Sequence, residues 1–461
     1  MEDKTVYICD NCGHKEYKWT GRCPSCGTWN SFSETKVSKK QPVRLSDQGT
    51  AAAAPVPLAS CATGEQVRIF SGIQEIDRVL GGGIMKGSAI MIGGEPGIGK
   101  STLMLQLAES VSRQMKVLYI SGEESAPQIK QRADRMGLSG KEMDILCETD
   151  LDAIMRVLNS GKYSFVILDS IQTAISREMG NTAGTVNQLK YTCTTLTDWA
   201  KLKDAVVIMI AHVTKDGNIS GPKTIEHMVD TVLYFENSGT DLRIVRASKN
   251  RYGSIDEVAI FRMMEKGLEQ IKNPETIFLT KRDGEIPPGI STAAVYEGTR
   301  VFLVELQALT VPAKAGVSRI FSDKIDSSVI SRISAILEKR CRIKFSDQDI
   351  YVNVSGGIRI KDVGIELPIA MTLYSARTGI PVSGSVLSAG ELSLTGEVLN
   401  VRNIEGRART AADFGFKRLV SPAPVPKDTC IKFERIKVIN DGIKAVFGKA
   451  TSAEPEDKEI Q

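Results

Sequence analysis

The sequence predicts an α/β fold followed by an α+β domain, with a small metal-binding module in front of both. Three observations lead to this prediction: four cysteines in two matched pairs near the start, a glycine-rich loop between an apolar strand and a helix, and closely spaced apolar strands in the last third. A chain of 461 residues is too long for one ordinary core, since domains average about 150 residues. We therefore expect several domains.

The composition is that of a globular protein, with 42% apolar and 25% charged residues. The 59 Lys and Arg against 55 Asp and Glu leave a formal net charge of +4, which does not by itself indicate a polyanionic partner. No apolar run of signal-peptide length opens the chain, and none reaches about 18 residues. We expect a cytoplasmic protein without a membrane partner, whose cysteines stay reduced.

Four cysteines form two C-x2-C pairs that are separated by a short spacer. They are Cys9, Cys12, Cys23 and Cys26. Each pair can form a tight turn with both sulfurs facing one point, so two turns offer four thiolates to a tetrahedral Zn²⁺. With all four positions filled by protein, the zinc would be structural, and it would supply most of the folding free energy of this module. Trp19 and Trp29 could stack on nucleic-acid bases, but we expect them to pack over the metal core.

The domain boundaries follow from changes in composition. Residues 1–32 form the predicted zinc ribbon, and residues 33–66 are rich in Ser, Lys, Ala and Pro without apolar periodicity, as is typical of a linker. Residues 67–273 carry the predicted α/β core. Residues 274–450 form the α+β domain, and residues 451–461 form an acidic tail.

A glycine-rich loop joins a strand predicted at 89–92 to a helix predicted at 101–113, and a short helix is expected at 76–80 before three glycines. The loop, GEPGIGKS, matches the pattern GxxxxGK[ST], whose backbone amides and helix N-terminus bind phosphate. Lys100 would neutralise the β and γ phosphates of ATP, and Ser101 would ligate Mg²⁺. The expected ATP-binding residues are Gly94, Glu95, Pro96, Gly97, Ile98, Gly99, Lys100, Ser101 and Thr102.

Acidic residues follow two further apolar runs. Glu123 and Glu124 come after VLYIS, and Asp169 ends FVILD. Open α/β sheets bind ligands at the carboxyl ends of their strands. Asp169 is therefore expected to hold Mg²⁺, directly or through water, although a strand-end Asp can also cap a helix. Glu123 or Glu124 is expected to orient the attacking water, and the sequence does not distinguish them.

A fourth apolar run ends in His212, which could sense the γ phosphate or satisfy a buried hydrogen bond. The polar segments 176–186 and 213–223 could grip a strand of nucleic acid, or be plain surface loops.

These motifs resemble a known ATPase core. GGEPGIGKST, ISGEES, ILDS and IAHVTKDG are similar to the RecA-type core. With the four-cysteine motif and KNRYG at 249–253, the chain resembles the bacterial RadA (Sms) family, whose usual signature is KNRFG. The resemblance implies a ring-forming, hexameric ATPase of recombinational DNA repair, a helicase that drives branch migration on single-stranded and branched DNA alongside RecA. A nucleotide-switched, clock-type scaffold without motor activity is the alternative.

Lys249 and Arg251 stand two positions apart on a strand-like stretch, so their side chains can project toward the same side. The two cations could reach the γ phosphate of a neighbouring subunit, as an arginine finger does, or hold DNA phosphates. The alternative is a solvated basic turn without a partner.

The last third is similar to the proteolytic domain of Lon, most clearly at AGELSLTGEVL. That pattern places Glu366 at the nucleophile position and Arg407 at the lysine position. A carboxylate has no hydroxyl to form an acyl-enzyme, and an arginine cannot act as a base. We therefore expect an inactive Lon-like domain rather than a protease, one that serves ring assembly and DNA docking. The candidates for DNA docking are weak, because ordinary surface charge explains them equally well. They are Lys314, Arg319 and Arg359.

Overall fold

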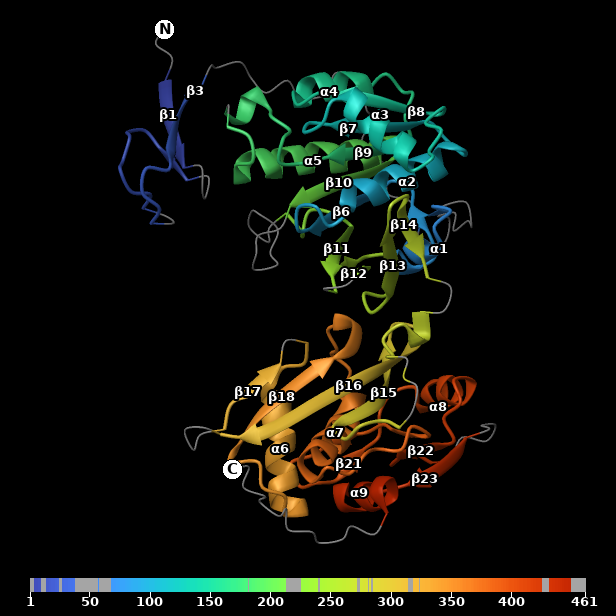
Figure 1. The fold of residues 1–461 in the computed structure, drawn as a ribbon. Coiled ribbons are helices and arrows are strands. Elements are labelled where there is room, and N and C mark those ends of the chain that lie inside the picture. Colours follow the sequence, from blue (N-terminus) through green and yellow to red (C-terminus); the bar gives the residue numbers. More distant parts are fainter. Residues whose placement is uncertain are drawn as a thin grey trace. The chain divides into compact units, whose positions relative to one another are not determined.

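The computed structural model describes residues 4–9, 14–24, 27–37, 57, 68–180, 182–212, 225–238, 241–271, 274–280, 282, 285–313, 318–322, 324–424 and 431–448. The chain divides into two compact units. The first comprises Met1–Glu236 and Arg243–Gln270, and the second comprises Asn237–Leu242 and Ile271–Gln461 (Figure 1). Among the described helices, none is long and apolar enough to span a membrane.

The N-terminal segment forms a three-stranded antiparallel sheet in the order β2-β1-β3. Its strands are β1 (Lys4–Cys9), β2 (Lys15–Glu16) and β3 (Phe32–Val37). Cys9, Cys23 and Phe32 form its small core. Trp19 and Trp29 are 55% and 69% exposed, so the prediction that they pack over this core is wrong. Phe32, with the partly buried Tyr7, takes that role instead.

A nine-stranded sheet forms the centre of the first unit, in the order β14-β13-β12-β11-β6-β10-β9-β7-β8. Its strands are β6 (Ala89–Gly94), β7 (Val117–Ser121), β8 (Met143–Cys147), β9 (Phe165–Asp169), β10 (Val206–His212), β11 (Thr231–Asn237), β12 (Leu242–Asn250), β13 (Val258–Met264) and β14 (Gly267–Gln270). A short pair, β4 (Arg68–Ile69) and β5 (Ile84–Met85), flanks the first helix.

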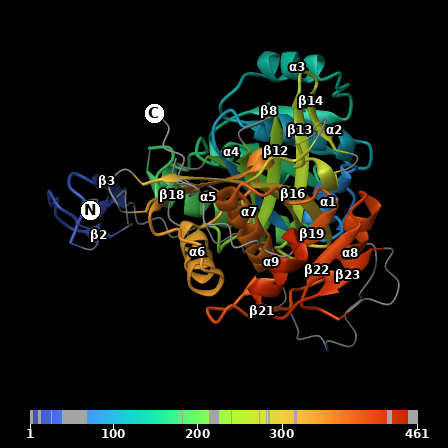
Figure 2. The same cartoon turned by 60° about the horizontal axis from the view of Figure 1, so that its bottom comes forward.

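Helices cover both faces of this sheet, which can be followed in Figures 1 and 2. They are α1 (Gln74–Val79), α2 (Lys100–Ser112), α3 (Ala126–Arg135), α4 (Leu151–Leu158) and α5 (Val186–Lys203). Along β6, Ile90 and Ile92 pack with α1 and α2, whereas Ala89 and Met91 pack with α4 and α5. Burial on both faces explains why these strands read as continuous apolar runs.

The central strands are parallel, which gathers their carboxyl ends on one edge. β6 pairs in parallel with β10 and β11, β9 with β10 and β7, and β7 with β8. The edge residues Gly94, Ser121, Asp169 and His212 therefore end neighbouring strands, as expected from the sequence.

The second unit has a seven-stranded sheet in the order β17-β18-β16-β15-β19-β22-β23. Its strands are β15 (Ile290–Glu297), β16 (Arg300–Pro312), β17 (Ile320–Ser322), β18 (Gln348–Val354), β19 (Val386–Ser388), β22 (Arg418–Ser421) and β23 (Lys432–Arg435), and a small pair is formed by β20 (Glu391–Leu392) and β21 (Val398–Leu399). Its helices are α6 (Ser327–Cys341), α7 (Glu366–Thr378), α8 (Ile404–Asp413) and α9 (Ile439–Phe447). This is the α+β arrangement that the sequence predicts.

Candidate functional site

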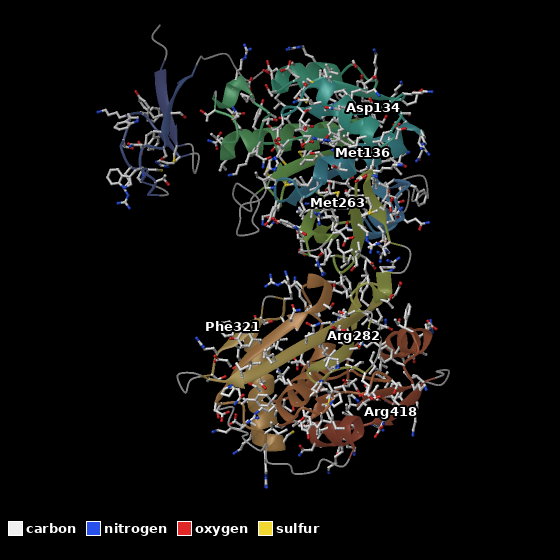
Figure 3. The ribbon with its side chains drawn as sticks, viewed as in Figure 1. Asp134, Met136, Met263, Arg282, Phe321 and Arg418 are labelled. Carbon is white, nitrogen blue, oxygen red and sulfur yellow. The ribbon has the colours of Figure 1, made fainter. Side chains whose placement is uncertain are left out.

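The glycine-rich loop leaves β6 at Gly94 and enters α2 at Lys100. Gly97 has φ 75° and Gly99 has φ 115°, a region that side chains with a Cβ rarely adopt. A Cβ on Gly99 would also lie 2.6 Å from Cε of Met263, a β13 residue labelled in Figure 3. The positive φ favours glycine at Gly99, whereas the Met263 methyl lies at the end of a flexible side chain and could move aside.

The Lys100 side chain folds over this loop. Its ammonium donates to the carbonyl oxygens of Gly94 (2.7 Å) and Glu95 (2.9 Å), and the residue is only 4% exposed. Burial lowers the pKa of Lys100, against an opposing effect from the carboxylates of Asp169 and Glu123. The two carbonyl oxygens are neutral acceptors, so Lys100 can exchange them for phosphate oxygens at the N-terminus of α2.

A hydrogen-bonded chain connects Lys100 to Glu123. Lys100 Nζ lies 3.4 Å from Nδ1 of His212, and Nε2 of His212 lies 3.1 Å from Oε1 of Glu123. A lysine ammonium can only donate, so Nδ1 of His212 accepts and Nε2–H donates to Glu123. Ser170 donates a second hydrogen bond to the same carboxylate oxygen (2.5 Å). Burial alone would raise the pKa of Glu123, but the hydrogen bonds from Ser170 and His212 outweigh it and lower the pKa.

Glu124 belongs to a different set of contacts. Its carboxylate accepts a hydrogen bond from Arg132 on α3, and its backbone N–H donates to the Ser121 hydroxyl (3.0 Å). The structure thus separates the two glutamates that the sequence leaves equivalent: Glu123 faces Lys100 and His212, whereas Glu124 is paired with a helix.

Asp169 at the end of β9 is held by Tyr119. The phenol of Tyr119 donates to Oδ2 of Asp169 at 2.5 Å, and both residues are buried. Burial and the Asp169 carboxylate raise the pKa of Tyr119 well above its ordinary range, so the phenol stays protonated and donates. Sequence reasoning missed Tyr119. The available signal was a tyrosine inside a buried strand, which needs a partner for its hydroxyl.

These groups fit a triphosphate with a divalent cation. The loop amides, the N-terminus of α2 and Lys100 provide positive potential for phosphate. Ser101 and Thr102 are half-buried in the first turn of α2. The Asp169 carboxylate and the Ser101 hydroxyl are the oxygen ligands that Mg²⁺ prefers. The site could therefore hold ATP and Mg²⁺ with the residues that the sequence singles out.

Lys249 and Arg251 lie at the opposite edge of the sheet. The ammonium of Lys249 donates to the carbonyls of Glu226 (3.1 Å), His227 (3.1 Å) and Val229 (2.7 Å). Arg251 pairs with the buried Asp230 (3.1 Å). All three ammonium hydrogens of Lys249 thus have acceptors, while the Arg251 side chain stays 53% exposed.

Asp230 marks the position of this pair relative to β6. Its Oδ2 accepts from the backbone N–H of Ala89, the first residue of β6 (3.0 Å), while the loop begins at the last residue, Gly94. From Ala89 to Gly94 the strand makes five steps of roughly 3.3 Å, or about 17 Å. The exposed cation Arg251 therefore lies a strand length from the phosphate loop of its own chain.

The turn that carries Arg251 packs on the glycines after α1. A Cβ on Gly81 would lie 2.9 Å from Cα of Gly253, and a Cβ on Gly253 would lie 2.8 Å from Cα of Gly81. Arg68 donates to the carbonyls of Gly83 (2.8 Å) and Tyr252 (2.7 Å), which joins the two segments. The glycine triplet and KNRYG, distant in the sequence, thus form one structure.

Glu366 and Arg407 do not form a reactive dyad. Glu366 accepts hydrogen bonds from Arg332 (2.5 Å) and from the backbone N–H of Leu392 (2.8 Å). Arg407 is 0% exposed and pairs with Asp362 at 2.7 Å. Each residue is held in its own ion pair, and the absence of protease chemistry stays a prediction.

The two cysteine turns of the ribbon share one backbone pattern. Cys9 N–H donates to the carbonyl of His14 (2.8 Å), and Cys23 N–H donates to that of Thr28 (2.9 Å), five positions on in each case. Both cysteines are buried. Cys12 and Cys26 lie outside the described residues. The matched turns fit the tetrahedral thiolate zinc site that the spacing predicts.

The structure describes some of the DNA contacts expected from the sequence, and the described ones have partners within the chain. In segment 176–186, Gln188 accepts from Ser176 N–H (2.8 Å) and donates to the Gly180 carbonyl (2.5 Å), which ties the segment to α5. It includes a short 3₁₀ turn, η3 (Arg177–Met179). Arg319 is paired with the buried Asp349. Arg359 has partners of its own, and residues 213–223 and Lys314 lie outside the described residues.

Family models match three parts of the chain. The AAA domain matches residues 63–218, the rubredoxin metal binding domain matches residues 7–34, and subunit ChlI of Mg-chelatase matches residues 322–424. These matches support ATP and zinc as ligands. With the observed sheets they confirm the predicted fold class, an α/β ATPase core between a zinc ribbon and an α+β domain.

Curated relatives match over nearly the whole length. "DNA repair protein RadA" of Treponema pallidum (strain Nichols) is 50% identical over 93% of this chain and 94% of that protein. The protein of the same name from Bacillus subtilis (strain 168) is 42% identical over 91% and 93%, and that from Aquifex aeolicus (strain VF5) is 37% identical over 97% and 100%. On its glycine-rich loop, its paired cysteines and this similarity, the chain belongs to the RadA family of DNA repair proteins.

Proposed function

We propose that this chain is an ATP-dependent DNA motor, a helicase that moves along single-stranded DNA and migrates branched recombination intermediates. One observation carries the proposal: the exposed cation Arg251 lies at the far edge of the strand whose other end carries the phosphate loop. Arg251 is thus out of reach of its own nucleotide, and its exposed side chain, paired on one side with Asp230, would serve the nucleotide of a neighbour. Subunits that complete each other's sites work as a closed ring, for which a hexamer is our proposal.

At the nucleotide site, Lys100, Glu123 and His212 would each have a distinct role. Lys100 gives up the carbonyls of Gly94 and Glu95 and binds the β and γ phosphates. Glu123, rather than Glu124, orients the attacking water, because its carboxylate faces His212 and Lys100 whereas that of Glu124 is paired with Arg132. His212 links the γ-phosphate position to Glu123. This link is suited to report the state of the nucleotide through a hydrogen bond.

Mg²⁺ would be held by Ser101 and by Asp169, which Tyr119 orients. When bound, it would neutralise charge on the phosphates. Zinc would be held by Cys9, Cys12, Cys23 and Cys26 and would stabilise the ribbon without taking part in hydrolysis. The proposed macromolecular partners are single-stranded and branched DNA and the recombinase RecA.

Lys249 and Arg251 would have different roles: Lys249 stabilises a turn, and Arg251 contacts the neighbouring nucleotide. Lys249 fixes the turn that ends at Asp230, since its three hydrogens bind carbonyls of that turn. Arg251, anchored through Asp230, would extend its exposed guanidinium to the γ phosphate of the adjacent subunit, as an arginine finger does.

Mixing two inactive variants tests this arrangement. Lys100→Ala removes the phosphate ligand and Arg251→Ala removes the cation offered to the neighbour. In a mixed ring, an Arg251→Ala subunit beside a Lys100→Ala subunit regains one complete site at their interface. We expect ATPase activity to return on mixing, measured as phosphate release with single-stranded DNA. Arg262→Ala, which changes an exposed arginine of the same sheet, is the control and should stay active alone.

The motor itself is tested by extension of a strand-exchange joint with and without ATP. ATP-dependent extension that both Lys100→Ala and Arg251→Ala abolish supports the proposal. ATP hydrolysis that is indifferent to DNA, without extension, would instead favour the nucleotide-switched scaffold.

A further inference from the structure

An exposed apolar row crosses one face of the seven-stranded sheet. Strand register places Leu309 of β16 opposite Tyr351 of β18, and Tyr351 opposite Phe321 of β17. The three side chains are 58%, 39% and 42% exposed, respectively. Their strand neighbours Ile350 and Val352 are buried. Because side chains alternate between faces, this row lies opposite the core face and is not needed to build the core.

The aromatic part of the row is held in a fixed arrangement. The rings of Phe321 and Tyr351 are stacked, with centroids 4.7 Å apart and planes 10° apart. The Arg319 guanidinium lies over the Phe321 ring at 5.7 Å from its centroid. Arg319 is in turn held by two hydrogen bonds to the buried Asp349, at 2.6 and 3.3 Å. The rings thus form a rigid surface with a fixed cation beside it.

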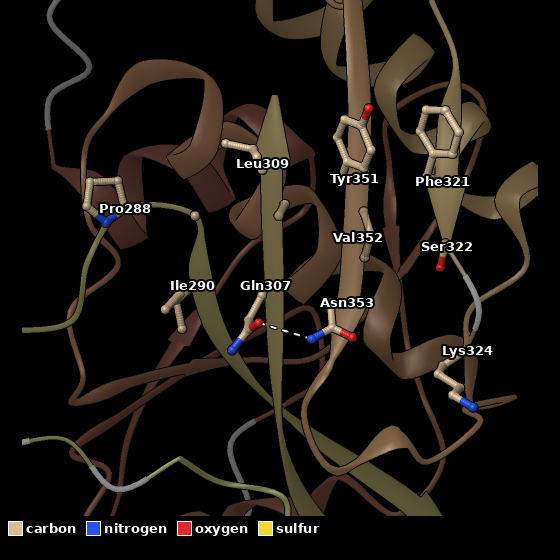
Figure 4. A pocket seen from close by; sticks show the side chains of 12 residues that line it. Pro288, Ile290, Gln307, Leu309, Phe321, Ser322, Lys324, Tyr351, Val352 and Asn353 are labelled. Atoms are coloured by element: carbon tan, nitrogen blue, oxygen red, sulfur yellow. Dashed lines mark hydrogen bonds between the residues drawn. The ribbon is translucent and has the colours of Figure 1, made fainter. Parts of the chain in front are cut away.

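Polar groups lie next to the rings in a cavity of about 570 Å³, shown in Figure 4. Asn353 donates to the Gln307 side chain (3.1 Å). These two residues are paired across β18 and β16, two positions from the pair of Tyr351 and Leu309. Lys324 and Ser322 line the cavity on the β17 side, and the opposite wall begins at Pro288.

We propose that this cavity, which we call the ring platform (Leu309, Tyr351, Phe321, Gln307, Asn353 and Lys324), binds unstacked bases of single-stranded DNA. Flat rings stack on bases of any sequence, amide groups hydrogen-bond base edges, and Lys324 supplies positive charge for the phosphates. Bases of an intact duplex are stacked on one another and offer no free face to Tyr351 and Phe321. The platform therefore selects single strands. This inference rests on the proposed function, since it names where the DNA strand is held.

The test is DNA binding by the full chain, measured as fluorescence anisotropy of labelled oligo(dT) of about 20 nucleotides. We expect Phe321→Ala combined with Tyr351→Ala to weaken oligo(dT) binding at least about tenfold, since each stacked base contributes substantially. Affinity for a duplex of equal length should change less. Tyr351→Phe keeps the ring and should bind like wild type. Phe414→Ala removes an aromatic side chain of matched exposure (41%) elsewhere in the second unit and should also bind like wild type.

Three results would overturn the proposal that the ring platform binds single-stranded DNA. The first is equal oligo(dT) binding by wild type and the double variant. The second is a change in oligomeric mass in the double variant, measured by mass photometry, which would assign this face to a second copy of the chain. The third is equal weakening by Phe414→Ala or Tyr351→Phe. A wild-type chain that binds no DNA at all would contradict the proposed function itself, whereas wild-type binding without any effect of the variants contradicts only the platform. Thermal unfolding of each variant identifies loss of fold, and Lys324→Ala, a change at a half-buried residue outside the core, then repeats the test on a folded chain.

Discussion

Lys100 and Arg407 are both buried cations at functionally suggestive positions, but their partners differ in charge. Lys100 is held by two carbonyl oxygens and a neutral imidazole nitrogen. Arg407 meets the carboxylate of Asp362 at 2.7 Å and the carbonyl oxygens of Ala294 and Arg402. A phosphate can replace neutral acceptors around Lys100, whereas Arg407 is already neutralised. The charge of the partner, rather than burial of the cation, separates the binding site from the structural one.

The largest effect is expected from substitution of Lys100. Lys100→Ala should lower ATP turnover about 1,000-fold, because it removes a cation that stabilises charge on the transferred phosphate. Steady-state phosphate release measures this loss, and far-ultraviolet circular dichroism should be unchanged. Undiminished turnover in a folded variant would refute the role of the loop.

The two glutamates provide a matched pair. Glu123→Gln should lower the single-turnover rate of ATP hydrolysis at least about 100-fold, as expected for loss of a general base. Glu124→Gln changes a carboxylate that is paired with Arg132 and should keep most of the rate. If Glu124→Gln has the larger effect, the assignment of the base is reversed.

Arg407 should matter for stability instead. Arg407→Ala leaves the Asp362 carboxylate without its buried partner, and we expect the unfolding free energy of the second unit to fall by about 3–5 kcal/mol. Urea unfolding measures this change. Lys344→Ala breaks an exposed ion pair with Asp347 and should cost less than about 1 kcal/mol. A variant Arg407→Ala as stable as wild type would show that the pair is not structural.

Tyr119→Phe should have a smaller, selective effect. Loss of the phenol leaves Asp169 unoriented, so the Mg²⁺ concentration for half-maximal hydrolysis should rise about tenfold. ATP binding without Mg²⁺, measured by fluorescent-nucleotide displacement, should be unchanged. Tyr163→Phe removes an exposed tyrosine–aspartate hydrogen bond, to Asp144, away from the site and serves as the control. An unchanged Mg²⁺ requirement would contradict the orienting role.

The smallest effect is expected in the pH profile. Hydrogen bonds lower the pKa of Glu123 below its ordinary value of 4.5, so the carboxylate remains deprotonated, and competent as a base, as pH falls to that value. Ser170→Ala removes one of these bonds and raises the pKa. The acid limb of the rate should therefore begin at higher pH than in wild type, which single-turnover rates across pH would measure. A limb at the wild-type position would contradict the assignment.

Local features of the fold could be predicted from the sequence. A helix expected at 101–113 begins at Lys100 and ends at Ser112, because the glycine loop fixes its start. A helix expected at 76–80 occupies Gln74–Val79. The pairing between distant segments could not be predicted. The separation of Glu123 from Glu124 depends on His212 from β10 and Arg132 from α3.

Two further features could not be predicted from the sequence. The exposure of Trp19 and Trp29 depends on which side chains fill the small ribbon core, and composition does not reveal this. The placement of Arg251 at the far edge of the sheet follows from the meeting of β12 with the start of β11, where Arg251 N–H donates to the Asp230 carbonyl (3.1 Å). Side-chain alternation alone indicates only that Lys249 and Arg251 share a side.

Asp230 uses one carboxylate oxygen for the Ala89 amide and the other for Arg251. An asparagine there could accept only one of these bonds, and its amino group would face a donor in either orientation. A glutamate is longer by one methylene and would not keep both contacts inside a packed site. The position therefore admits little variation, and we expect relatives to keep an aspartate there although it lies at the opposite end of β6 from the phosphate loop.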